Sequence, residues 1–233
     1  YGPCAFLDEY NANKVFSSID YYGRYAFNNQ PNVCSWNLLQ LGKSISFLID
    51  SDPQKSLNIV LGIINTFKVI YNAKYLKIMG QKVGIINPKE EDRSLILELL
   101  TILQEESMDY TLTFRYLCYA VSDNTLWPFY NLFNTSHRLK AWLSKWRINI
   151  AKQGKSITEV ANLMFTLNPA VIPRNHKIEE VIQSVQEKTN DFSRLNIMLN
   201  VLSNPYQETH KESIEYMRSP SDQERIDKTF CGT

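Results

Sequence analysis

The sequence is poor in histidine and lacks the short motifs of most enzymes. Only three histidines occur in 233 residues, His137, His176 and His210, which leaves little material for a nucleophilic triad or a zinc site. There is no G-x-S-x-G, no G-x-G-x-x-G and no phosphate-binding G-x-x-x-x-G-K. Taken alone, the chain contains no recognisable catalytic apparatus.

Cysteine is also scarce. The four cysteines are widely separated and form no C-x-x-C pair, which argues against a zinc site and against the dense disulfides of small secreted domains. Cys34 and Cys118 lie in apolar helical patterns, so we expect both to be inert core thiols. Cys231 is near the polar end of the sequence, where burial is least expected, and is predicted to be the most reactive thiol. This cysteine usage predicts a reducing, intracellular compartment.

Neither charge nor hydrophobicity favours nucleic acid or membrane as a partner. The formal net charge is +1, too small for binding nucleic acid through overall charge. No apolar run approaches the roughly 20 residues that span a bilayer. With 44% hydrophobic residues the chain can bury a sizeable core. Because it begins at Tyr1 without methionine or a signal-peptide pattern, we expect it to be part of a longer protein.

Apolar residues recur at helical spacing from Cys34 onward. One stripe, which Gly80 is expected to end, consists of Leu57, Val60, Leu61, Ile64, Phe67, Tyr71, Tyr75 and Ile78. Asn87-Pro88 is expected to start the next helix, with the stripe Ile96, Leu99, Leu100 and Leu103, and Ser156 to Glu159 form a capping box. The fold class is therefore predicted to be mainly α, with a loop-rich region at 1–33, a helical body at 34–205 and an extended polar tail at 206–233.

Two charged patterns each have a functional and a structural interpretation. Basic residues run from Arg138 to Lys155 without an acid between them, but Trp142 and Trp146 lie on the apolar stripe of the same segment, which favours a solvated helix face over an interface for nucleic acid or an acidic partner. His176 is followed by two glutamates in H-x-x-E-E. No second histidine stands at metal-binding spacing, so an acidic helix start is the favoured interpretation.

Residues 17–31 mix polar, aromatic and glycine residues in a way that suits neither a core nor a flexible linker. A loop held rigid by its own aromatics often carries function, although a structural aromatic loop is the alternative. Together with other blocks, this segment resembles the selenoprotein O (SelO, or YdiU) family. The blocks run from the first residue to the last and are Tyr1-Gly2-Pro3, Phe6-Leu7-Asp8, Ser18-Ile19-Asp20, Gly23 to Pro31, Trp36-Asn37-Leu38, Asn168 to His176, Asn204-Pro205-Tyr206 and Thr229 to Thr233.

The resemblance implies a protein-kinase-like fold that transfers AMP from ATP to hydroxyl groups of acceptor proteins. Tyr1-Gly2 is similar to the end of the family's Asp-Tyr-Gly, whose Asp binds metal and would directly precede Tyr1. The other ATP-binding and catalytic residues would also lie upstream. Mg or Mn with ATP is then the cofactor of the parent protein, none is expected in this part, and the location is expected to be the bacterial cytoplasm. The chain itself would carry the large helical lobe.

Residues 3–31 would correspond to the activation segment. Its candidate site residues are Asp20, Gly23, Arg24, Tyr25, Asn29 and Gln30. Some relatives pair the cysteine at position 231 with one in this segment, but Phe16 occupies that partner position here. Cys4 is the nearby alternative, and a Cys4–Cys231 bridge stays open at this point. The rival to an enzyme lobe is a helical protein-binding module without chemistry, which would use the basic helix or the tail.

Overall fold

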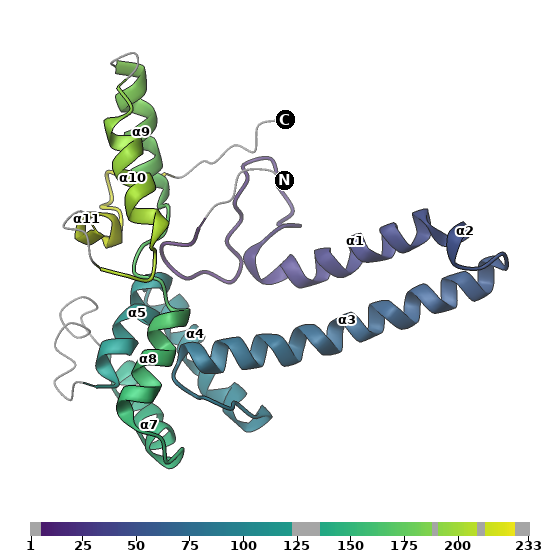
Figure 1. Ribbon diagram of the computed structural model, residues 1–233, viewed down its shortest axis with the longest axis horizontal. Helices are drawn as coiled ribbons and strands as arrows, with labels where there is room; N and C mark the ends of the chain where they lie inside the picture. The colour runs from purple at the N-terminus through teal and green to yellow at the C-terminus, as the bar shows by residue number, and fades with distance from the viewer. Residues whose placement is uncertain (1–5, 123–135, 188–190, 209–212, 227–233) are drawn as a thin grey trace.

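The protein is described from a computed structural model, in which residues 6–122, 136–187, 191–208 and 213–226 are placed well enough to describe. This part is mainly helical and contains no strand longer than one isolated bridge (Figure 1). Its helices are α1 (Gln30–Ser44), α2 (Ser46–Ile49), α3 (Pro53–Lys82), α4 (Arg93–Glu105), α5 (Tyr110–Ala120), α7 (His137–Lys152), α8 (Ile157–Leu167), α9 (Asn175–Glu187), α10 (Ser193–Ser203) and α11 (Ser213–Met217). Two 3-10 turns, η1 (Phe27–Asn29) and η2 (Glu90–Asp92), precede α1 and α4.

The main core lies where α4, α5, α7 and α8 meet the end of α3 (Figure 1). Trp142 and Trp146 stack with ring centroids 5.8 Å apart and are fully buried. Their indole N–H groups donate to Leu95 O at 2.8 Å and Val83 O at 2.7 Å, so neither buried donor is left unpaired. The prediction that both tryptophans face the core is confirmed, as is the buried stripe on α4.

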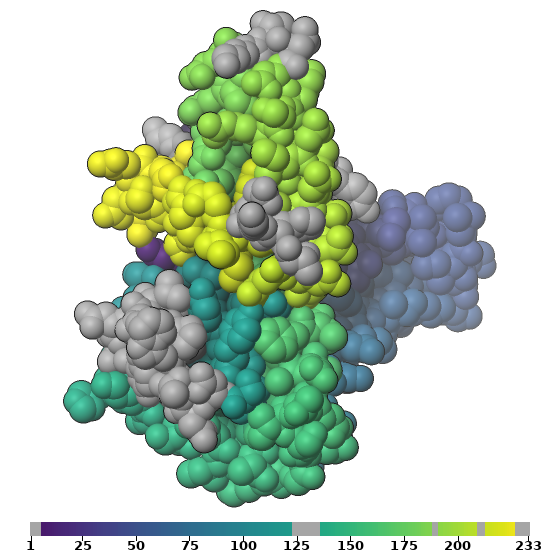
Figure 2. Space-filling model, turned by 60° about the vertical axis from the view of Figure 1, so that its left-hand side comes forward, coloured from purple at the N-terminus to yellow at the C-terminus, as the bar shows by residue number. Residues whose placement is uncertain are grey.

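A second, smaller core joins α9, α10 and α11 to α5, and includes Leu112, Val171, Met198 and Tyr216. Figure 2 shows this upper layer standing on the layer of α7 and α8, with the end of the described chain lying across it. The tail was predicted to be extended, but α11 forms within it and buries Ser213, Tyr216 and Met217. The apolar side chains Tyr216 and Met217 pack into the second core, and this explains why a helix forms within an otherwise polar segment.

Helices α1 and α3 form a long arm that leaves the rest of the molecule (Figure 1). They approach closely at Gly42, where a side chain would collide with Val60. Only one face of each helix is covered by the other, so many apolar residues of the arm are exposed. Cys34 on α1 is one of the exposed residues, which makes the prediction of a core thiol wrong. The corresponding prediction for Cys118 on α5 is confirmed.

Helix boundaries follow local capping only in part. Ser156 accepts a hydrogen bond from the Glu159 backbone N–H at 3.1 Å, and α8 begins next to it as predicted. Gly80 does not end α3, which continues to Lys82; the missing side chain instead lets Pro88 pack against the helix. The start predicted at Asn87-Pro88 is also wrong, because α4 begins at Arg93 after the 3-10 turn.

Candidate functional site

The loop-rich first region is fastened to the helical body by a short antiparallel bridge. Tyr10 N donates to Met108 O and Tyr110 N donates to Asp8 O, both at 2.8 Å. The Tyr10 and Tyr110 rings stack with centroids 5.6 Å apart. The region therefore enters the body of the protein at the amino end of α5.

One buried arginine strengthens this attachment. Arg174 lies in the Asn168–His176 block, and its side chain has no exposed surface. Its Nη1 binds the Asp8 carboxylate and donates to Asp109 Oδ2 at 2.8 Å. Asp109 also caps α5 by accepting from Leu112 N at 2.8 Å, and it accepts from the Ser219 hydroxyl at 2.7 Å. Arg174 and the Asp109 carboxylate together thus connect the first region, α5 and the tail.

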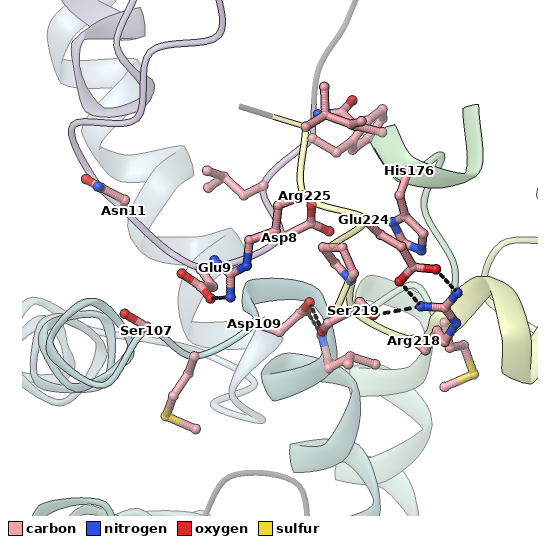
Figure 3. Close-up of a pocket in the computed structure, with 18 of the residues that line it drawn as sticks. Asp8, Glu9, Asn11, Ser107, Asp109, His176, Arg218, Ser219, Glu224 and Arg225 are labelled. Carbon is pink, nitrogen blue, oxygen red and sulfur yellow. Dashed lines mark hydrogen bonds and ion pairs between the residues drawn. The ribbon is translucent and has the colours of Figure 1, made fainter. Parts of the chain in front are cut away.

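A cavity of about 1010 Å³ opens beside this junction, between the first region, α9 and the tail (Figure 3). Arg218 and Glu224 face each other across its edge at 2.6 Å, and this pairing lowers the pKa of Glu224 and raises that of Arg218. Arg225 binds Glu9, so the tail also reaches the first region directly. Burial is the main cause of the lowered pKa of His176, whose imidazole lines the cavity and has no hydrogen-bond partner among the described residues.

The H-x-x-E-E pattern does not assemble around this histidine. Glu180 pairs with Lys177 at 2.8 Å, and Glu179 accepts from Gln183 at 3.1 Å. In the described part of the chain, no three His, Cys, Asp or Glu side chains are grouped so that they could hold a metal ion. The same ranges contain no helix with the length and apolar character needed to cross a membrane.

The six residues predicted for an activation segment lie close together, four of them in a tightly closed loop, Asn29 in η1 and Gln30 at the start of α1. The Asp20 carboxylate accepts from Arg24 N at 2.9 Å and from Tyr25 N at 2.8 Å. Gly23 has a φ of +64°, a conformation that other residues adopt only with strain. Asn29 Nδ2 donates to Arg24 O at 2.7 Å, and Gln30 Nε2 donates to Tyr25 O. These side chains therefore fix the backbone of the loop.

The tip of this loop presents aromatic side chains to solvent. Tyr21 and Tyr22 are 86% and 99% exposed, although aromatic surface is normally buried where it can be. The Arg24 guanidinium stacks over the Trp36 ring of α1 at 4.4 Å, which holds the tip near the base of the arm. Phe16, where the resemblance implied a partner cysteine in some relatives, packs against the main core. Cys4 and Cys231 lie outside the described residues.

Sequence reasoning did not single out Arg174, Asp109 or Lys82 as site residues. Arg174 was noticed only within a recognisable block, and the Asp-x-x-Leu start of α5 carried no signal beyond a helix cap. Most basic residues of α7 are exposed, although Arg147 is half-buried and donates to Ala120 O at 3.4 Å. Arg138 pairs with Glu105 and Lys145 with Glu98, and Lys155, beyond the end of α7, pairs with Glu159. This favours the interpretation as a solvated face.

The described residues thus form a helical body to which a buried ion pair fastens an aromatic loop. The model of the family described as protein adenylyltransferase SelO matches residues 1–203, and the chain belongs to this family. It is similar to protein nucleotidyltransferases YdiU from Agrobacterium fabrum (39% identical over 233 residues), Rhizobium johnstonii (38% over 234) and Alkaliphilus metalliredigens (38% over 233). The whole chain is covered in each case, against 47%, 46% and 46% of these relatives, so it spans about half their length.

Proposed function

We propose that this chain is the carboxy-terminal, helical part of a protein adenylyltransferase. The parent enzyme joins the oxygen of a Ser, Thr or Tyr hydroxyl on an acceptor protein to the α-phosphorus of ATP. The bond between the α- and β-phosphates breaks, pyrophosphate leaves, and the hydroxyl proton is released. Membership of the SelO family over residues 1–203 is the observation that carries this proposal. The relatives' printed name, protein nucleotidyltransferase, agrees with nucleotidyl transfer in general.

The nucleotide and its Mg or Mn ion are assigned to residues upstream of Tyr1 in the parent, on the strength of the family resemblance. The described residues do not fit the metal, because they bring together no set of three metal-binding side chains. We therefore assign no chemical step to them. Their proposed contribution is to hold residues 6–31 as a rigid activation-segment-like loop and to offer its tip to the acceptor protein.

The exposed Tyr21 and Tyr22 at the tip are the proposed acceptor contacts. Amphipathic aromatic side chains at the tip of a rigid loop bind partners at little cost in conformational entropy. The Arg174 ion pairs would hold this loop in a fixed position on the helical body. A kinase-like arrangement of the complete enzyme is part of the same proposal.

The test uses the full-length parent protein with isotopically labelled ATP, Mg or Mn and a cell lysate as the source of acceptors. Mass spectrometry should find AMP on protein hydroxyls. Tyr22→Ala should lower transfer to acceptor proteins while leaving the KM for ATP unchanged, and Tyr206→Ala, on an exposed tyrosine far along the chain, is the matched control. A folded full-length protein that transfers no AMP but captures partners through this chain would favour the rival function, a helical binding module.

A further inference from the structure

A second cavity, of about 750 Å³, lies beneath the aromatic loop on the side of α3 and α5. Its walls are mainly apolar and include Phe6, Leu7, Phe16, Ile19, Phe27 and Ile172. Cavities of this size, apolar with a few placed polar groups, are typical of sites for small organic ligands. This one is distinct from the junction cavity of Figure 3, although both touch the start of the first region.

The cavity contains one lysine, whose ammonium is held by a carbonyl oxygen and by aromatic rings and not by a carboxylate. Lys82, in the last turn of α3, donates from Nζ to Leu167 O at 3.2 Å and lies 4.8 Å from the centre of the Phe114 ring. No carboxylate of the described residues forms an ion pair with it, and burial lowers its pKa from 10.5 to about 8. A buried ammonium normally has an anionic partner, because desolvation without one is costly.

A further polar atom on the wall also lacks a partner. The Ser17 hydroxyl is buried and forms no hydrogen bond within the described ranges. Asp20, the acid at the rim, already accepts from two backbone N–H groups. A cation and a hydroxyl donor are thus available in an apolar enclosure, while the nearby carboxylate is occupied. This combination suits a ligand that is apolar over most of its surface and carries one anionic group.

We propose that this cavity binds a small amphipathic anion, with its apolar part against the aromatic walls and its carboxylate or sulfonate on Lys82 Nζ. The test below measures ligand binding and not AMP transfer, so its outcome is separate from that of the proposed function. Attraction between the anion and the ammonium is strong where water is excluded, and it gives the site its selectivity for charge. Neutral ligands of the same shape would gain only the apolar contact.

The experiment titrates the full chain with two fluorescent probes of the same ring system, anilinonaphthalene sulfonate and the uncharged N-phenylnaphthylamine. Lys82→Met should weaken binding of the sulfonate by about tenfold, the value of one lost charge interaction in a partly buried site. It should leave binding of the neutral probe unchanged. Lys77→Met, on the exposed face of the same helix, is the matched control and should change neither. Decanoate, a carboxylate with an apolar chain, should displace the sulfonate from wild type.

Equal binding of the sulfonate to wild type and to folded Lys82→Met protein would overturn the proposal, as would an equal loss for both probes.

A pH series on wild type keeps the test decisive if the variant does not fold. The titratable groups around Lys82 are Tyr110 and Cys118 on α5 with Asp20 and Tyr25 on the loop. Burial raises the pKa of Tyr110 and that of Cys118, the latter to about 11. Sulfonate affinity should therefore fall between pH 7 and pH 10 as Lys82 loses its proton, and a flat profile would contradict the site.

Discussion

Arg174 and Asp109 form an ion pair of 2.8 Å although 65 positions separate them in the sequence. Their side chains are 0% and 4% exposed. Because Arg174 also binds Asp8, the pair sits at the point where the aromatic loop joins the helical body. Its loss would therefore affect both the stability of the fold and the position of the loop.

Replacing Arg174 by Met should lower the free energy of unfolding by about 3–5 kcal/mol, since Asp109 would be left buried without its cation. Urea denaturation followed by circular dichroism measures the change. Arg194→Met removes a 3.3 Å ion pair with Glu180 in which the arginine is exposed, and it should cost less than about 1 kcal/mol. Similar losses for the two variants would contradict the assigned role of Arg174.

Two glycines with positive φ differ in what surrounds them. Gly84 has a φ of +83°, and an added Cβ would lie 2.8 Å from Met164 Sδ and 2.9 Å from Val160 Cγ1. Gly154 has a φ of +64° with nothing within 4 Å of that position. Gly154→Ala should cost about 1 kcal/mol of backbone strain. Gly84→Ala should cost about 2–4 kcal/mol, because overpacking of the core is added to the strain. Equal thermal stabilities would refute this distinction.

Lys82 should make stability depend on pH at alkaline values. Its pKa is lowered to about 8 in the folded protein from 10.5, so between these values the unfolded chain binds more protons at this site. The contribution of Lys82 to stability should therefore rise as pH rises from 8 to 10.5, and it should be least favourable below pH 8. Denaturation of wild type and Lys82→Met across this range isolates the effect, because shifts at tyrosines cancel in the difference. A constant difference would count against it.

The two described cysteines should differ sharply in reactivity. Cys34 is exposed on α1, whereas Cys118 is buried and burial raises the pKa of its thiol to about 11. Since the thiolate is the reactive form, brief alkylation of the reduced native protein should modify Cys34 at least about tenfold faster than Cys118. Peptide mass spectrometry measures both rates, with Cys34→Ser as the control for labelling elsewhere. The prediction that Cys231 is the most reactive thiol can be checked in the same digest.

Local and periodic signals predicted the parts of the fold that depend on neighbours in sequence. The cap at Ser156 and the inward face of Trp142 and Trp146 follow from spacing alone. Spacing also indicates which face of α1 is apolar, but not whether another element covers it. The exposure of Cys34 was missed for that reason.

The candidate site was predictable only in part. Its loop was recognised as unusual from residues 17–31, and the six candidate residues do lie together. The Arg174 ion pairs and the Lys82 cavity depend on contacts between distant segments, which no local pattern encodes. Gly80 shows the same limit, since Pro88 packs where a helix end was expected.

The arm formed by α1 and α3 has a mechanical consequence. Its 30-residue helix extends about 45 Å at the usual rise of an α-helix, and the outer part packs against α1 and α2, as at Gly42 and Val60. Such an element opens as a separate cooperative unit, with a lower free energy than the stacked tryptophan core. Amide hydrogens near Phe47 and Leu48 should exchange well before those of α7, and a protease should cut there first. We therefore expect local opening of the outer arm to leave the attachment of the aromatic loop at Arg174 intact.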